Sequence, residues 1–388
     1  MKKKIVILGS TGSIGNTLIN ILKKDKEKFS IEILAINKNY KKLLKQIEIV
    51  NVKNLIIINK KSFEITKILL KNKNINIYNN FDSLKKILKY KKVDYTMSAI
   101  SGFDGLKPTL DIIKFTKTIA IANKESIICG WNLIKKNLDK FGTKFIPIDS
   151  EHFSIWSLME NVKSENIEKI FITASGGPFR KYPLKDFKNI TPKKALKHPN
   201  WSMGKKISID SATMMNKVFE IIEAKKIFDF KYSQLNIVIH HQSYLHAIVK
   251  FDNGLTKLLV HDTNMSIPIF NSIYPNHSKS ISSNDLNMTI LNNLSLENVD
   301  KQRFPVIKII NQLTNKDSLF ETVIVSANDN LVNRFLQNEI KFTDISIILL
   351  KILNLYEFRK FKKIKPKNVK EISKLVDYVS LKINSIRV

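Results

Sequence analysis

The chain has 388 residues, of which 43% are hydrophobic, and it carries a formal net charge of +31. These values predict two or three globular domains and exclude global disorder, and no apolar run approaches the roughly 20 residues that cross a membrane. The charge does not indicate a nucleic-acid partner. Lysines occur in nearly every segment beside abundant Asn and Ile, and all three residues have A/T-rich codons, so genome composition explains the excess. In addition, no nucleic-acid-binding signature accompanies the lysines.

The first 150 residues alternate short apolar runs with helical patterns. The apolar runs predict strands at residues 4–8, 31–36, 55–58, 93–97, 118–122 and 145–148. Helical patterns follow the first three of these runs, through Leu22, over residues 40–50 and over residues 63–70. This alternation predicts an α/β domain over residues 1–149, built on a Rossmann-like, doubly wound parallel sheet.

The regular alternation of predicted strands and helices ends after residue 149. Strands are predicted at residues 167–174, 237–251 and 255–260, and helices at 151–160 and 211–228. We therefore expect a central α+β catalytic domain over residues 150–275. Residues 276–304 show little periodicity and are interpreted as a linker.

Four helical patterns fill the C-terminal part. They lie at residues 305–314, 320–336, 343–354 and 367–384. They predict a helical domain over residues 305–388.

A glycine-rich turn follows the first predicted strand. Gly9, Gly12 and Gly15 form Gly-x-x-Gly-x-x-Gly between a strand and a helix, the position of a dinucleotide-binding fingerprint. The alternative is a tight turn without a ligand. After the second strand comes Asn37-Lys38-Asn39 and no carboxylate, which favours NADPH over NADH, unless these lysines only reflect the general lysine excess.

Acidic side chains follow the strand at residues 145–148. Asp149 and Glu151 flank Ser150 where ligands bind in doubly wound sheets, and Glu220 is a candidate third oxygen ligand. All-oxygen coordination favours Mg²⁺ or Mn²⁺ over zinc, and His152 is interpreted as a structural neighbour. The alternative for the acidic pair is the cap of the following helix.

A second group of polar residues suits an anion. Ser175 precedes two glycines, and Ser211 is expected at the start of a helix, where exposed N–H groups favour negative charge. On that helix Asn216 and Glu220 share a face, with Lys217 beside them. The alternative is an ordinary capped amphipathic helix. Residues 197–205, which include Trp201, are expected to form a lid.

Together these segments closely resemble the 1-deoxy-D-xylulose 5-phosphate reductoisomerase family over essentially the whole chain. The most specific segments are residues 9–15, 122–126, 149–152, 174–180 and 198–224. The resemblance implies NADPH- and metal-dependent rearrangement of 1-deoxy-D-xylulose 5-phosphate and its reduction to 2-C-methyl-D-erythritol 4-phosphate, in non-mevalonate isoprenoid synthesis. It also implies a homodimer, with Mg²⁺ or Mn²⁺ as the metal and Co²⁺ as a further candidate.

The resemblance also assigns roles to individual residues. It implies NADPH contacts at Thr11, Gly12, Ser13, Ile14, Asn37, Lys38, Asn39, Asn123, Glu125 and Gly204. It implies metal ligation by Asp149, Glu151 and Glu220. It implies substrate contacts, several with catalytic roles, at Lys124, Ser150, Glu151, Ser175, His198, Trp201, Ser211, Asn216, Lys217 and Glu220.

Three positions depart from the family pattern. Asn37 stands where Gly is usual, His241 where Pro is usual, and Asp329 where Glu is usual. None removes a proposed ligand, and Asn37 is expected to tolerate a positive φ if the turn requires one. The alternative function is another NADPH-dependent dehydrogenase of a phosphorylated hydroxy-acid or ketone.

The cysteine count bears on the compartment. Cys129 is the only cysteine, so an internal disulfide is excluded, as expected in a reducing environment. The apolar run at residues 5–8 is too short for a secretory signal, so we expect a cytoplasmic protein.

Overall fold

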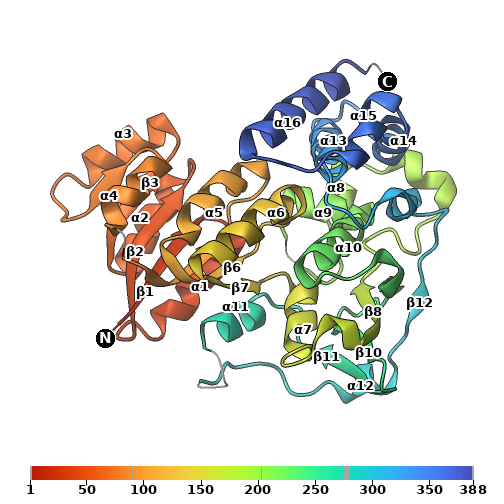
Figure 1. Cartoon of the computed structure of the whole chain (residues 1–388), viewed down its shortest axis with the longest axis horizontal. Coiled ribbons are helices and arrows are strands. Elements are labelled where there is room, and N and C mark those ends of the chain that lie inside the picture. The colour runs from red at the N-terminus through yellow and green to blue at the C-terminus, as the bar shows by residue number, and fades with distance from the viewer. Residues whose placement is uncertain (1, 90, 202, 275–278, 387–388) are drawn as a thin grey trace. The chain divides into compact units, whose positions relative to one another are not determined.

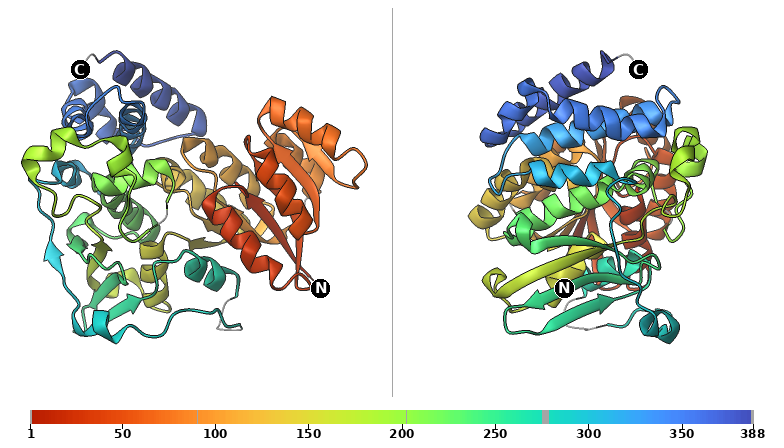
Figure 2. Two further views of the ribbon diagram at one scale, coloured as in Figure 1. Left: turned by 180° about the vertical axis from the view of Figure 1, so that it is seen from behind. Right: turned by 90° about the vertical axis from the view of Figure 1, so that its right-hand side faces the viewer.

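The computed structural model describes residues 2–89, 91–201, 203–274 and 279–386, which form two compact units (Figures 1 and 2). Unit 1 comprises Met1–Ser126, Leu133–Phe153 and Met265–Ser282. Unit 2 comprises Ile127–Asn132, Ser154–Asn264 and Ser283–Val388. The predicted division into three domains and a linker stays a prediction, and residues 276–278 of that linker lie outside the described residues.

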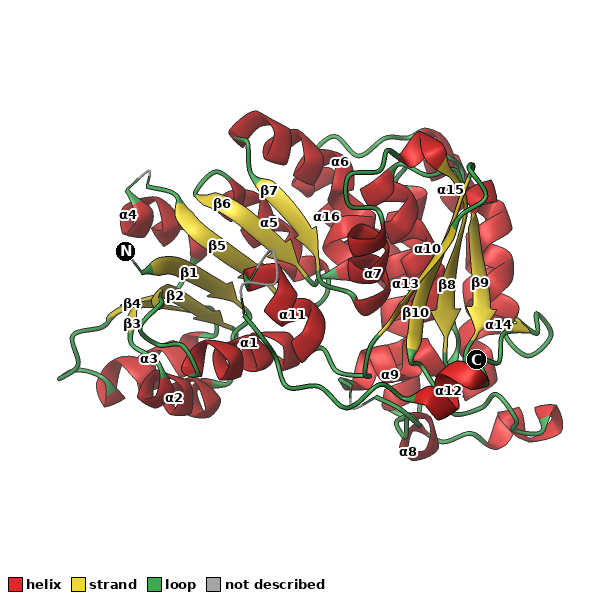
Figure 3. Cartoon of the chain, turned by 90° about the horizontal axis from the view of Figure 1, so that it is seen from below, coloured by secondary structure: helices red, strands yellow, loops and turns green. Residues whose placement is uncertain are grey.

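Unit 1 is built on a seven-stranded parallel sheet in the order β4-β3-β2-β1-β5-β6-β7. Figure 3 shows β1, β5, β6 and β7 side by side and pointing the same way. The strands are β1 Lys3–Leu8, β2 Phe29–Ile36, β3 Val52–Ile57, β4 Asn76–Tyr78, β5 Val93–Ser98, β6 Thr116–Ile121 and β7 Lys144–Pro147. Strand order reverses at β1, so the Rossmann-like prediction is confirmed and the switch point lies beside the glycine-rich turn.

The core of unit 1 explains why these segments form a sheet with helices against it. Ile5 and Ile7 of β1 are fully buried, and they share one apolar cluster with Leu18 of α1 and Leu43 of α2. The helices of unit 1 are α1 Ser13–Lys23, α2 Tyr40–Ile49, α3 Lys60–Leu69, α4 Leu84–Leu88, α5 Leu106–Ile113 and α11 Ser266–Ile273. Two further helices have residues in both units. Helix α6, Lys124–Phe141, belongs to unit 1 except for Ile127–Asn132, and helix α7, Ser150–Leu158, begins in unit 1 and ends in unit 2.

Helix α11 belongs to unit 1 although it is distant in sequence, and the sequence pattern did not predict it. It packs on α1 and adds Ile269 and Phe270 to the apolar cluster. Ser272 Oγ lies 2.7 Å from the buried Tyr95 Oη. The returning segment therefore covers part of the Rossmann-like sheet.

Unit 2 contains a mixed sheet in the order β11-β10-β8-β9-β12. Its strands are β8 Ile167–Ala174, β9 Leu235–Ile239, β10 Leu245–Phe251, β11 Thr256–Val260 and β12 Glu297–Asn298. The prediction of one strand over residues 237–251 is wrong, because a polar turn at residues 240–244 separates β9 from β10. In this turn Ser243 adopts a left-handed φ of 55°.

The prediction of one helix over residues 211–228 is also wrong. Helix α9, Lys205–Ala212, ends before α10, Met215–Phe228, begins, and Met214 between them has a left-handed φ of 65°. The Thr213 hydroxyl donates to the carbonyl of Ile209 and accepts from the N–H of Met215. Ser211 therefore lies in the last turn of α9, so the expected placement at a helix N-terminus is corrected.

The C-terminal helices of unit 2 gather around α13 (blue in Figure 1). The helices of unit 2 beyond α9 and α10 are α8 Pro192–Ala195, α12 Met288–Asn292, α13 Phe320–Leu336, α14 Phe342–Leu353, α15 Tyr356–Arg359 and α16 Val369–Asn384. The segment Pro305–Gln312, predicted as an α-helix, is a 3₁₀ helix. Among the described residues, none of the helices combines the length and the apolarity needed to cross a membrane.

We predict that Gly9→Ala destabilises the protein far more than Gly254→Ala. Both glycines have positive φ, 85° and 87°, but a Cβ at Gly9 would lie 2.5 Å from the carbonyl oxygen of Ala99, whereas nothing lies within 4 Å at Gly254. Backbone strain alone costs about 1 kcal/mol, and the clash adds roughly 2 kcal/mol or more. Urea unfolding of both variants measures this difference, and equal losses would contradict it.

Candidate active site

The glycine-rich turn leads directly into the N-terminus of α1. Gly12 is the N-cap residue, with no side-chain cap and no acidic residue in the first turn. The first N–H groups of a helix lack partners within the helix, so this end suits an anion. Ser10 and Gln46 exchange two buried hydrogen bonds of 2.9 and 2.8 Å that tie the turn to α2.

The segment after β2 has a shape that does not require glycine. The positive-φ residues among those described do not include Asn37, so an Asn in place of the family's Gly fits without strain. Asn37 accepts a hydrogen bond of 3.1 Å from the N–H of Asn59 through its carbonyl. Asn39 caps α2 by accepting from the N–H of Lys42. The turn is therefore fixed from both sides, with Lys38 between these two anchors.

Helix α6 begins at Lys124, directly after β6. The side chain of Asn123 caps this helix by accepting from the N–H of Ser126 at 2.6 Å, and its amide donates to the carbonyl of Gly102 at 2.8 Å. It also donates to the carbonyl of Ile100. These hydrogen bonds use both protons of the Asn123 amide, so its side chain has no further proton to donate to a cofactor.

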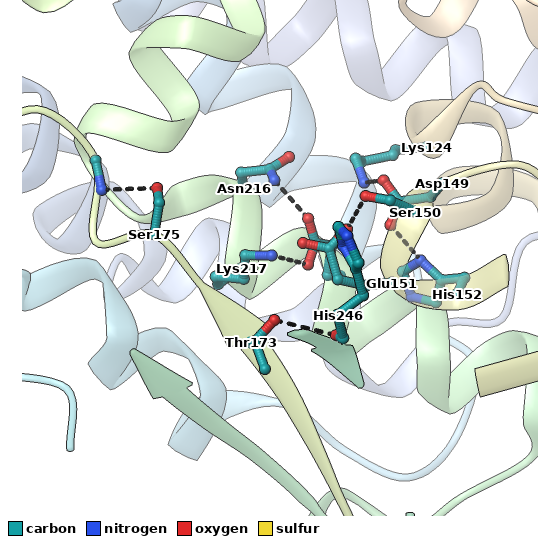
Figure 4. A network of polar contacts seen from close by, with 12 residues as sticks. Lys124, Asp149, Ser150, Glu151, His152, Thr173, Ser175, Asn216, Lys217 and His246 are labelled. Atoms are coloured by element: carbon teal, nitrogen blue, oxygen red, sulfur yellow. Dashed lines mark hydrogen bonds and ion pairs between the residues drawn. The ribbon is translucent and has the colours of Figure 1, made fainter. Parts of the chain in front are cut away.

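Asp149, at the carboxyl end of β7, lies between two nitrogen partners (Figure 4). Lys124 forms an ion pair with it, and His152 Nδ1 lies 2.9 Å from its Oδ1. Burial alone would raise the pKa of Asp149, but the Lys124 ammonium and the His152 ring together hold that pKa well below its usual range. Asp149 is therefore ionised at neutral pH, as a ligand for a hard cation must be.

Glu151 is the second of the two candidate metal-binding carboxylates in unit 1. One of its oxygens and one of Asp149 lie within 4.8 Å of each other, a separation that one cation can bridge. Ser150 donates a hydrogen bond to Glu151. The predicted pair of carboxylates after β7 thus comes together in the structure.

Glu220 is buried on α10 in unit 2. Asn216 and Lys217 each hold one of its oxygens at 2.5 Å, as their spacing on a helix allows. Glu220 and Lys217 are both buried. A buried carboxylate is costly unless it is paired, and this pairing supplies the compensation.

The loop after β8 packs directly on the end of α9. A Cβ at Gly177 would lie 2.8 Å from the carbonyl oxygen of Ser211, so only glycine permits this approach. Ser175 Oγ accepts from the N–H of Gly177 at 3.1 Å and lies 3.1 Å from His198 Nε2. Unit 2 therefore brings Ser175, His198 and Ser211 into one region.

The predicted lid region contains a defined aromatic contact. Trp201 is half-buried and meets His246 edge to face, with ring centroids 6.2 Å apart. His246, on β10, stacks on His261 at 3.7 Å. Sequence reasoning did not select His246, in β10, or His261, directly after β11, because histidines in and beside strands carry no spacing signal. Gly204 precedes α9 as its N-cap, and Ser202 of the predicted lid lies outside the described residues.

Family models and known proteins match this chain along nearly its whole length. The family model described as 1-deoxy-D-xylulose 5-phosphate reductoisomerase matches residues 5–130, and the two models for its C-terminal domains match residues 145–228 and 261–379. The reductoisomerase of Pelagibacter ubique is 67% identical over 387 residues, covering 100% of both chains. That of a Sulfurihydrogenibium species is 37% identical, covering 92% of both.

The chain belongs to the 1-deoxy-D-xylulose 5-phosphate reductoisomerase family. Among solved structures, the reductoisomerase of Zymomonas mobilis in complex with NADPH matches with a TM-score of 0.89 at 29% identity, covering 99% of both chains. A reductoisomerase in complex with NADPH, fosmidomycin and magnesium gives the same score and identity, covering 99% of this chain and 98% of the other.

We predict that His198→Gln flattens the pH dependence of stability between pH 4 and 6.5. Burial, with Lys217 nearby, lowers the pKa of His198 to about 4, whereas the unfolded ring has a pKa near 6.5. Between these values the unfolded state binds more protons, so the free energy of unfolding rises with pH in the wild type. Urea unfolding at stepped pH measures the slope, and an unchanged slope in the variant would contradict the buried neutral ring.

Proposed function

We propose that the chain catalyses the NADPH- and divalent-metal-dependent conversion of 1-deoxy-D-xylulose 5-phosphate to 2-C-methyl-D-erythritol 4-phosphate, a step of non-mevalonate isoprenoid synthesis. The observation that carries this proposal is the 67% identity, over the full length, to a protein with that activity in its name. The geometry of each unit supports it, because unit 1 carries a glycine-rich turn at a helix start and a carboxylate pair, while unit 2 gathers Ser175, His198 and Ser211 in one region.

NADPH is proposed to bind along the carboxyl edge of the parallel sheet. The uncapped start of α1 at Thr11, Gly12, Ser13 and Ile14 suits its pyrophosphate. Lys38, between Asn37 and Asn39, suits the 2′-phosphate, and no carboxylate stands there to repel it. Asn123, Glu125 and Gly204 complete the proposed NADPH contacts. NADPH supplies the hydride, and the protein supplies position and electrostatics.

The metal is proposed to bind Asp149, Glu151 and Glu220. The donor set fits Mg²⁺ or Mn²⁺, with Co²⁺ as a further candidate, because all three ligands are carboxylates and Asp149 is held ionised. A divalent cation there supplies Lewis-acid stabilisation of negative charge on substrate oxygens. Lys124, which is paired with Asp149, would donate a hydrogen bond to a substrate oxygen held by that cation.

The phosphate of the substrate is proposed to bind in unit 2. Ser175, His198, Ser211, Asn216 and Lys217 would surround it, and Trp201 would cover the reacting end and exclude water. The corrected position of Ser211 changes the reason for its role. Ser211 would reach the phosphate because the loop at Gly177 lies directly against it, and not because it begins a helix. Ser150 completes the proposed substrate contacts.

Assembly and location are part of the proposal. We expect a homodimer, as the family resemblance implies, and a cytoplasmic protein, in keeping with a single buried cysteine, Cys129. Size-exclusion chromatography with light scattering measures the assembly directly.

The decisive assay is NADPH oxidation with 1-deoxy-D-xylulose 5-phosphate, with and without Mg²⁺ or Mn²⁺. We expect oxidation that requires both substrate and metal and that fosmidomycin blocks. NMR of the product separates the proposed reaction from a simple dehydrogenase of a phosphorylated ketone, because only the former yields a branched carbon skeleton. A straight-chain alcohol as the product would overturn the proposal.

We predict that Glu151→Gln lowers metal-dependent turnover by orders of magnitude while NADPH binding is unchanged. The amide keeps the size of the side chain but removes the charge that a hard cation requires. Glu165→Gln, at an exposed position in unit 2, is the matched control. NADPH fluorescence titration and steady-state kinetics measure the two effects, and normal turnover in Glu151→Gln would remove it from the metal site.

A further inference from the structure

The imidazole of His198 has a different environment at each nitrogen. The backbone N–H groups of Asn200 and Trp201 lie 3.2 and 3.0 Å from Nδ1. Nε2 lies 3.1 Å from Ser175 Oγ. A backbone N–H only donates, so Nδ1 must present its lone pair, and the proton of the neutral ring must reside on Nε2.

This tautomer determines what Ser175 offers to a ligand. Its hydroxyl oxygen accepts from the N–H of Gly177 and from the Nε2–H of His198. Both lone pairs of the oxygen are then occupied, so the hydroxyl proton is the group that remains to donate. With the opposite tautomer, Nε2 would accept the hydroxyl proton of Ser175, and this hydroxyl would have no proton left to donate to a phosphate.

The backbone that presents the two N–H groups is fixed by the side chain of Asn200. Its amide donates to the carbonyl of His241 at 2.5 Å and lies 2.9 Å from Ser243 Oγ, both in the turn between β9 and β10. That turn is tied to the end of β8, because the N–H of His240 donates to the carbonyl of Ala174 at 2.7 Å. The chain of contacts thus returns to the residue preceding Ser175.

We propose that Asn200 is a positioning residue that fixes the Nε2–H tautomer of His198, whose N–H then holds Ser175 so that the Ser175 hydroxyl donates its proton toward a phosphate group. The proposal rests on the proposed function only for the identity of the phosphorylated substrate. His241, where the family usually has Pro, is compatible with it, because the contact uses the backbone carbonyl that either residue provides.

The tautomer is tested by ¹H–¹⁵N long-range NMR of the ¹⁵N-histidine-labelled full chain at pH 7, with His198→Gln used to assign the ring. The wild type should show Nε2–H. Asn200→Ala should shift the ring toward a mixture of tautomers, and Asn200→Asp serves if the alanine variant fails to fold. The matched control is Asn330→Ala. The half-buried side chain of Asn330 likewise donates to a backbone carbonyl, that of Ser326, and to a hydroxyl, that of Ser380, but it lies far from Asn200 in the sequence.

Binding of inorganic phosphate gives the second readout. The Kd for phosphate should rise roughly tenfold in Asn200→Ala, the effect of losing about one hydrogen bond to a charged group, and should be unchanged in Asn330→Ala. A wild-type ring protonated on Nδ1, or an Asn200→Ala ring that keeps the wild-type tautomer and phosphate affinity, would overturn the proposal.

These measurements require no turnover, so they separate two kinds of failure. If the wild type shows the Nε2–H tautomer but oxidises no NADPH with 1-deoxy-D-xylulose 5-phosphate, the proposed function fails and the role of Asn200 stands. If the enzyme is active but the ring carries its proton on Nδ1, the role of Asn200 fails alone.

Discussion

The burial of carboxylates beside lysines is the constraint on which the site depends. Asp149 is paired with Lys124 in unit 1, and Glu220 with Lys217 in unit 2, and all four side chains are largely shielded from water. An unpaired buried carboxylate would either protonate or destabilise the fold, so each pairing offsets the cost of burying its carboxylate. At Asp149 the pairing also holds the pKa well below its usual range, which maintains the charge that the proposed cation needs.

Close backbone approach at a glycine is the second constraint, and both regions proposed to bind a phosphate depend on it. In unit 1, Gly9 lets the turn lie against the backbone at Ala99 beside the switch point of the sheet. In unit 2, Gly177 lets the loop after β8 lie against Ser211. Each region thus joins a glycine contact to nearby donors, helix N–H groups in the first and Ser175 with His198 in the second. A phosphorylated cofactor and a phosphorylated substrate suit these two regions.

Sequence patterns predicted what depends on local periodicity. The parallel sheet, the carboxylate pair after β7 and the shared face of Asn216 and Glu220 follow from alternation and spacing, and they are confirmed. The break at Met214 was missed because left-handed backbone at a non-glycine residue has no sequence signal. Helix α11 was missed because its place in unit 1 depends on contacts distant in sequence. The role of Asn200 lies in a loop whose hydrogen bonds only the tertiary structure defines.

The most direct test of the account is manganese anomalous diffraction from crystals of the chain grown with NADPH, fosmidomycin and Mn²⁺. The account predicts one anomalous peak bound by oxygens of Asp149, Glu151 and Glu220. A metal peak elsewhere, or a peak at Asp149 and Glu151 without an oxygen of Glu220 among its ligands, would contradict the proposed site.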